Sequence, residues 1–129
     1  MLAPGTTFAR SSNIQVKLKE QINSKQNNSD EALQKVSSQV AYSIELIKNK
    51  EYENAERSLL NLQTQFPNVA TIHELLGNVY YLRKDLSKAY SSYKKALNLN
   101  PNNLDTTRMI QKIEGIRSDL RLPSGSGGM

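Results

Sequence analysis

Several residue types recur at one fixed spacing in the middle of the chain. Pro67 recurs as Pro101, Ala55 as Ala89 and Leu59 as Tyr93, each at the same offset in residue number. Self-similarity at a period of roughly 34 residues is typical of an array in which one supersecondary unit is repeated. Each unit of such an array buries its apolar face only against its neighbours. The apolar share of 37% and the mean hydropathy of −0.60 suit a layered array better than a single deep core.

Between the breaks in the pattern, apolar residues follow a helical period. In the first segment they step by three or four residues along one face, at Leu33, Val36, Val40, Ile44 and Ile47. The same reasoning predicts helices over residues 31–49, 52–65, 70–83, 87–98 and 104–120. Pro67 and Pro101 are expected to end the second and fourth helices, because the residue before a proline avoids the α conformation.

The second repeat carries a longer motif. His73-x2-Leu76-Gly77-x2-Tyr80 is followed by Ala89-x3-Tyr93 and then by Pro101. This order resembles the tetratricopeptide repeat, whose pattern is W-x2-L-G-x2-Y, then A-x3-F, then P, and only the first aromatic residue is replaced, by His73. The resemblance implies an all-α fold in which antiparallel helix pairs form a right-handed superhelical stack.

The resemblance also assigns packing roles to the residues of the motif. Gly77 and Ala89 are expected to let the two helices of a repeat approach closely, and Tyr80 and Tyr93 to fill the space between them. Pro101 ends the second helix and sets the angle of the next repeat. The full set of structural positions is Ala55, Leu59, Pro67, Leu76, Gly77, Tyr80, Ala89, Tyr93, Ala96 and Pro101.

The resulting domain covers residues 30–122. We expect repeats at 36–69 and 70–103 and a capping helix at 104–122, although the first repeat is degenerate, with Gln39 and Ser43 at the aromatic and glycine positions. Residues 1–29 are predicted to be a flexible segment with at most one weak helix. The residues Ile14, Leu18 and Ile22 would form its stripe, but alternation from Ile14 to Leu18 suits a strand equally well. The Ser- and Gly-rich residues 123–129 are predicted to be a flexible tail.

Enzymatic chemistry is not evident in the chain. There is no Cys, and the single His73 is interpreted as filling the aromatic position of the repeat rather than as a ligand or base. No carboxylate pair accompanies a candidate nucleophile, and no phosphate-binding glycine loop is present. We therefore expect no catalysis, no metal and no cofactor. No segment approaches the ~20 apolar residues that cross a bilayer, and the sequence leaves a cytoplasmic or a periplasmic location open.

Positive charge is concentrated in the second repeat. The formal net charge of the chain is +5, and the basic cluster consists of Arg83, Lys84, Lys88, Lys94 and Lys95. A nucleic-acid surface would combine such a cluster with aromatic stacking platforms, but the tyrosines mostly occupy packing positions. The cluster is therefore interpreted as a solvated outer face with helix-end lysines, and nucleic acid is not expected as a partner.

The resemblance implies that a partner binds on the concave side, which is lined by the first helix of each repeat. The residues expected on this groove are Val40, Ile44, Ile47, Glu74, Asn78, Tyr81, Arg108 and Lys112. Some of the aliphatic members could instead be covered by residues 13–28 folding back. Repeats that clamp a partner's C-terminal carboxylate carry Asn or a basic residue at each of five positions. This chain departs at all of them, with Val40, Ile44, Leu75, Asp105 and Met109.

These features together predict a protein–protein interaction module, an adaptor or scaffold that holds a partner peptide or helix in the concave groove. Two alternatives remain open at this point. One is a chaperone that shields a secreted or membrane-bound client, and the other is a structural component that assembles with copies of itself through an exposed end of the stack.

Overall fold

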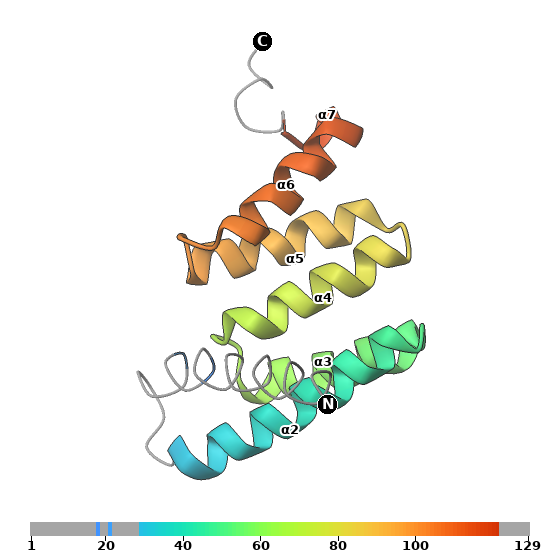
Figure 1. The fold of residues 1–129 in the computed structure, drawn as a ribbon. Coiled ribbons are helices and arrows are strands. Elements are labelled where there is room, and N and C mark those ends of the chain that lie inside the picture. The colour runs from blue at the N-terminus through green and yellow to red at the C-terminus, as the bar shows by residue number, and fades with distance from the viewer. Residues whose placement is uncertain (1–17, 19–20, 22–28, 122–129) are drawn as a thin grey trace, which may run out of the picture.

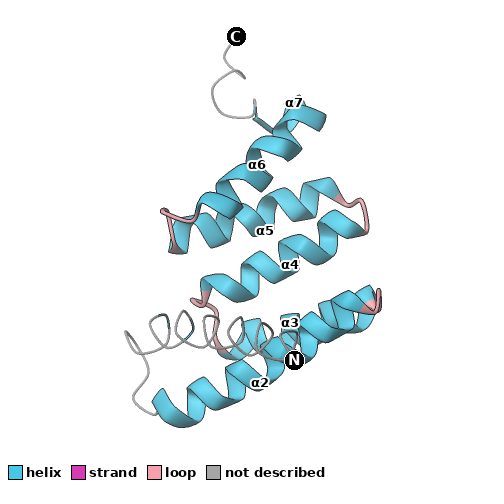
Figure 2. Ribbon diagram, in the orientation of Figure 1, coloured by secondary structure: helices cyan, strands magenta, loops and turns pink. Residues whose placement is uncertain are grey.

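The chain folds into helices that follow one another along a stack (Figure 1). The computed structural model describes Leu18, Gln21 and residues 29–121. Its helices are α2 (Ser29–Lys48), α3 (Tyr52–Gln65), α4 (Ala70–Leu82), α5 (Leu86–Leu99), α6 (Leu104–Ile116) and α7 (Ser118–Arg121). Figure 2 shows short loops between them and no strand in the described part of the chain. The prediction of an all-α, tetratricopeptide-like helical repeat is confirmed.

Two antiparallel pairs, α2 with α3 and α4 with α5, are built on the same turn. Each first helix is followed by a residue with left-handed backbone, Lys50 at φ 64° and Lys84 at φ 66°. The next backbone N–H returns to the helix, from Glu51 to Leu46 and from Asp85 to Tyr80, both at 2.8 Å. This is the Schellman arrangement, in which glycine usually occupies the left-handed position. The two turns are separated by one repeat period and reproduce that period in backbone geometry.

The second helices end in the same way as each other. Phe66 and Asn100 stand directly before Pro67 and Pro101 and have left the α-helical conformation, with φ values of −133° and −141°. Side-chain caps start α5 and α6. The carboxylate of Asp85 accepts from the Lys88 N–H, and the amide oxygen of Asn103 accepts from the Thr106 N–H. The two prolines therefore follow the ends of the second and fourth predicted helices, as the sequence predicts.

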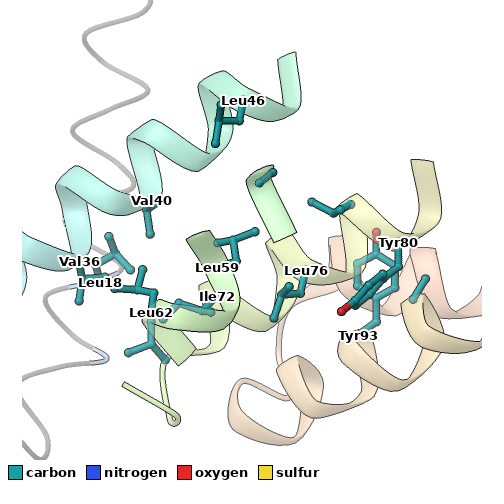
Figure 3. Packing of buried hydrophobic residues seen from close by; sticks show 14 of the residues in the cluster. Leu18, Val36, Val40, Leu46, Leu59, Leu62, Ile72, Leu76, Tyr80 and Tyr93 are labelled. Atoms are coloured by element: carbon teal, nitrogen blue, oxygen red, sulfur yellow. The ribbon is translucent and has the colours of Figure 1, made fainter. Parts of the chain in front are cut away.

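The closest approach within a pair occurs at Gly77 of α4. A Cβ atom added there would lie 2.5 Å from the Tyr93 ring on α5, much closer than two carbon atoms can approach. Tyr93 is almost fully buried, and so are Ala55, Leu59, Leu76, Ala89 and Ala96. Figure 3 shows the apolar cluster running from Leu18 and Val36 at one end to Tyr80 and Tyr93 at the other. The core is therefore a continuous layer along the stack, as stacked repeats require.

Polar contacts tie one repeat to the next at the edges of this layer. The Tyr80 hydroxyl donates to Glu56 of α3 at 2.8 Å, and Arg83 forms an ion pair with the same carboxylate at 2.6 Å. His73 is buried, and its Nε2 lies 2.9 Å from the Pro67 carbonyl oxygen. Because a carbonyl only accepts, Nε2 carries the proton of this bond. His73 therefore fastens α4 to the turn that precedes it, in addition to filling the aromatic position.

The first repeat replaces the glycine position with Ser43. The Ser43 side chain is fully buried, and its hydroxyl donates to Ser58 of α3 at 3.1 Å. Ser58 in turn donates to the amide oxygen of Gln39 at 3.4 Å. A small hydroxyl is tolerated between the helices because a partner on the facing helix satisfies it.

The predicted capping helix is not continuous. Helix α6 ends at Ile116, and α7 begins at Ser118, whereas the sequence predicts a single helix from residue 104 to 120. Arg117 leaves the helical conformation with φ −122° and ψ 80°, and its guanidinium makes two hydrogen bonds to Asp119. Side chains two residues apart in a helix point to different sides, so this pair requires a break in the helix. Gly115 weakens the helix just before it. The predictions for residues 1–17 and 123–129 lie outside the described residues.

The packing at Gly77 generates a prediction with an internal control. Gly77→Ala should lower the free energy of unfolding by ~1–3 kcal/mol, because the added methyl group collides with the Tyr93 ring. Gly115→Ala has no atom within 4 Å of the new methyl group and should raise it by ~0.5–1 kcal/mol through helix propensity alone. Urea denaturation followed by circular dichroism measures both values. Equal effects of the same sign would show that α4 and α5 do not meet at Gly77.

The contact between Tyr80 and Glu56 makes stability depend on alkaline pH. Burial, together with the Glu56 carboxylate, raises the pKa of Tyr80 from 10.0 to about 12. Between these values the unfolded chain carries the tyrosinate while the folded chain keeps the proton, so stability is full below pH 10 and falls as the pH rises toward about 12. Tyr80→Phe should make the urea midpoint less sensitive to this pH change. Tyr42→Phe, at an exposed tyrosine, should leave the sensitivity as it is.

Candidate functional site

The residues predicted to line the groove fall into rows that cross the stack. Val40, Glu74 and Arg108 are separated by one repeat period each and lie on α2, α4 and α6, and Ile44, Asn78 and Lys112 repeat this spacing one helical turn later. Residues four apart on a helix share a face, so each first helix presents the same face at equivalent places. The character of these rows changes along the stack from apolar at α2 to basic at α6.

At the α2 end the predicted groove is closed. Val40 is fully buried and belongs to the same apolar cluster as Leu18, which corrects its assignment to an accessible groove surface. Ile44 and Ile47 are half-buried and pack against that cluster. Leu18 packs onto these aliphatic residues, as the alternative of residues 13–28 folding back proposes for that segment. Leu18 and Gln21 both have helical backbone, and the other residues of that segment lie outside the description.

In the middle of the rows, two predicted groove residues have structural partners. Glu74 accepts hydrogen bonds from the Asn103 side chain and from the Thr106 hydroxyl, so it joins α4 to the start of α6. The amide oxygen of Asn78 accepts from the Tyr93 hydroxyl. Burial raises the pKa of Tyr93, with smaller contributions from Tyr81 and Glu74, which keeps this hydroxyl a donor. Sequence reasoning did not predict these bonds.

At the α6 end the face is open and combines apolar and cationic groups. The Lys112 ammonium lies 5.9 Å from the centre of the Tyr81 ring, so α4 and α6 present these two residues to the same surface. The Arg108 side chain is 74% exposed, and its contact with Asp105 is long, at 3.8 Å. Tyr81 itself is half-buried against the core, which fixes its ring.

Two further residues extend this surface. Leu82 and Ile116 are 45% and 58% exposed, and they too are separated by one repeat period. Leu82 shares a face of α4 with Asn78, and Ile116 follows Arg108 and Lys112 along one face of α6. The repeat spacing was the signal that could have found them. We define the α4–α6 surface as Asn78, Tyr81, Leu82, Arg108, Lys112 and Ile116.

The basic cluster of the second repeat is largely engaged within the protein. Arg83 is paired with Glu56, as described above. The ammonium groups of Lys88 and Lys94 lie 5.6 and 5.7 Å from the ring centres of Tyr80 and Tyr90. Lys84 holds the left-handed position of its turn. These cations therefore stabilise the outside of the second repeat, and among the described contacts only Lys95 of the five has no such role.

Within residues 29–121, together with Leu18 and Gln21, no group of three His, Asp or Glu side chains is placed to hold a metal ion. None of the helices in the described part of the chain has the length and apolar content to cross a membrane.

An array of paired helices with one open, mixed apolar and basic face defines a helical-repeat interaction protein. The model of the tetratricopeptide repeat family matches residues 70–103, so this chain carries a tetratricopeptide repeat over α4 and α5. The match has the same limits as the second repeat predicted from the sequence. Repeats of this family generally serve as protein–protein interaction modules and are generally not enzymes. No curated protein matches the chain.

The bonds of Glu74 generate a prediction that separates a structural from a binding role. Glu74→Ala should lower the free energy of unfolding by ~1–3 kcal/mol, because Asn103 and Thr106 lose their common acceptor. Amide hydrogen exchange should quicken in α6 more than in α3. Unchanged stability and unchanged exchange would mean that the carboxylate does not hold α6 and is available to a partner instead.

Proposed function

We propose that the protein is an adaptor or scaffold module that holds an acidic, amphipathic peptide or helix of a partner protein on the α4–α6 surface. The observation that carries this proposal is the contact of Lys112 with the Tyr81 ring, on two helices that also expose the side chains of Leu82 and Ile116. Apolar groups that stay exposed together, flanked by cations, suit a ligand with an apolar face and acidic edges.

The residues of the α4–α6 surface make different contributions to binding. Tyr81 supplies a rigid apolar body with a polar tip, and its half-buried ring loses little conformational freedom when a ligand covers it. Leu82 and Ile116 add apolar area on either side of it. Arg108 and Lys112 stand four residues apart on α6 and can meet two acidic groups spaced one helical turn apart. Specificity for an acidic partner then comes from α6, and affinity comes chiefly from α4.

Two alternative functions are each favoured by exposed side chains of the stack. A chaperone for a secreted or membrane-bound client is favoured by the exposure of Leu82 and Ile116, and it would bind unfolded apolar segments without a defined motif. Self-assembly through an end of the stack is favoured by Tyr42, which is exposed on α2. Binding to a panel of unfolded chains identifies the first, and light scattering against concentration identifies the second.

Affinity capture with cross-linking mass spectrometry tests the proposal, followed by titration of the captured partner. Tyr81→Ala should weaken binding by ~2 kcal/mol or more, with helical content unchanged. Arg108→Glu should weaken it further as the salt concentration falls, because the reversed charge is then screened less. Lys95→Glu makes the same change of charge on α5, away from this surface, and serves as the control.

The pattern among these variants decides the mechanism. The proposal requires that Tyr81→Ala and Arg108→Glu lower the affinity while Lys95→Glu leaves it near that of the original chain. Equal affinity of all three variants would exclude the α4–α6 surface, and a loss confined to Lys95→Glu would move the contact to the outer face of α5.

A further inference from the structure

Charge is distributed unevenly along the stack. Residues 29–69 carry four Lys and Arg against six Asp and Glu, a net charge of −2, whereas residues 70–121 carry nine against five, a net charge of +4. Helix α2 lies at one end of the stack and α6 lies near the other (Figure 1). The molecule is therefore acidic at the end that begins with α2 and basic at the end that carries the α4–α6 surface.

The side of α2 that points away from the core presents an aromatic ring and a carboxylate together. Tyr42 is 56% exposed, and Glu45 follows it by three residues on the same side of the helix. Ser38, one helical turn before Tyr42, is exposed as well, whereas Val36 and Val40 are buried on the opposite side. Among the contacts of the described residues, neither the Tyr42 hydroxyl nor the Glu45 carboxylate takes part in a hydrogen bond or ion pair. We define the α2 face as Ser38, Tyr42 and Glu45.

The α6 part of the α4–α6 surface offers the complementary groups. Exposed residues follow one another there at intervals of four, which places each beside the next along the helix. They are Leu104, Arg108, Lys112 and Ile116. Apolar side chains stand at the two ends of this row, and cations stand in the middle. The contact of Arg108 with Asp105 is long and solvent-exposed, so the guanidinium can turn to another anion at little cost.

We propose that the helix held on the α4–α6 surface is α2 of a second copy of this chain, which docks through its α2 face, so that copies associate head to tail. The inference rests on the proposed function, because it uses the same surface. It goes beyond that function in naming the occupant and the face by which the occupant binds.

The two faces match in charge and in the type of side chain. A cation is attracted to the face of an aromatic ring, as the Lys112 ammonium over the Tyr81 ring shows within one copy. The Arg108 guanidinium can meet the Tyr42 ring of the second copy in the same way. Glu45 lies one helical turn from Tyr42, as Lys112 lies one turn from Arg108, so the carboxylate can pair with the ammonium.

The difference between the two faces determines how an assembly grows. The α2 face contains no cation and the α4–α6 surface contains no carboxylate, so neither face can form these pairs with its own equivalent. The contact is therefore between unlike faces, and each end of an assembly keeps one face open for another copy. Growth with concentration is expected instead of a limit at the dimer. Because opposite charges contribute to the contact, salt should weaken it.

Sedimentation velocity over a range of concentrations tests the contact on the full chain. The average mass of the original chain should increase with concentration, and the increase should be larger at low salt than at high salt. Tyr42→Ala and Arg108→Glu should each weaken the association at least about tenfold, because each variant loses one of the two faces. Leu60→Ala shortens an exposed apolar side chain on α3, outside both faces, and should leave the association unchanged.

A mixture of the two weakened variants identifies the head-to-tail arrangement. The Arg108→Glu variant keeps an intact α2 face, and the Tyr42→Ala variant keeps an intact α4–α6 surface. The mixture should therefore form a heterodimer that does not grow further, although each variant alone stays monomeric at the same concentration. Circular dichroism of each variant should match that of the original chain, which shows that the substituted side chains and not the fold account for the loss.

Two results would overturn the inference. One is an original chain that stays monomeric at every concentration up to its solubility limit, which would leave the capture of an acidic helix from another protein standing. The other is association that Tyr42→Ala abolishes and Arg108→Glu retains, because the copies would then meet through α2 alone. If Arg108→Glu loses self-association but binds a captured partner as tightly as the original chain does, the partner does not use this surface, and the second copy remains its occupant.

Discussion

The contact between Gly77 and the Tyr93 ring fixes the geometry on which the rest of the stack depends. Because no Cβ separates the two helices, α4 and α5 come close enough for Tyr93 to be buried and for its hydroxyl to reach Asn78. That approach orients the groove face of α4 and therefore the position of Tyr81. A contact that looks purely structural thus sets where the aromatic part of the α4–α6 surface lies.

Most of the fold could be predicted because its signals are local and repeated. A proline that ends a helix and a small residue where helices meet each act within a few residues, and the repeat period applies both of them twice. The turns at Lys50 and Lys84 lie one repeat period apart. Their left-handed backbone was not predictable from residue type, because that conformation favours glycine and costs a lysine ~1–2 kcal/mol. The identical hydrogen bonds of the two turns hold both lysines there.

The site was predicted less completely, because its missing parts depend on contacts that are distant in the sequence. Periodicity gives the face of a helix on which Val40, Glu74 and Asn78 lie, but it does not reveal what covers that face. Leu18 covers Val40 from outside the repeats, and Asn103 and Tyr93 engage Glu74 and Asn78 from other parts of the stack. The break at Arg117 was missed for a different reason, because the apolar stripe continues to Leu120 and does not reveal the local ion pair of Arg117 with Asp119.

The face formed by the first helices consequently differs between its two ends. Different groups cover it at α2 and at α6. At the α2 end the amide of Gln21 performs for α4 the capping function that Asp85 and Asn103 perform for the following helices. At the α6 end the ammonium of Lys112 lies over the half-buried Tyr81 ring, and Leu82 is exposed. The first repeat is also the degenerate one, and it depends on Leu18 for part of its core. Leu18 therefore completes packing in the degenerate repeat that the motif residues of the second repeat provide for themselves.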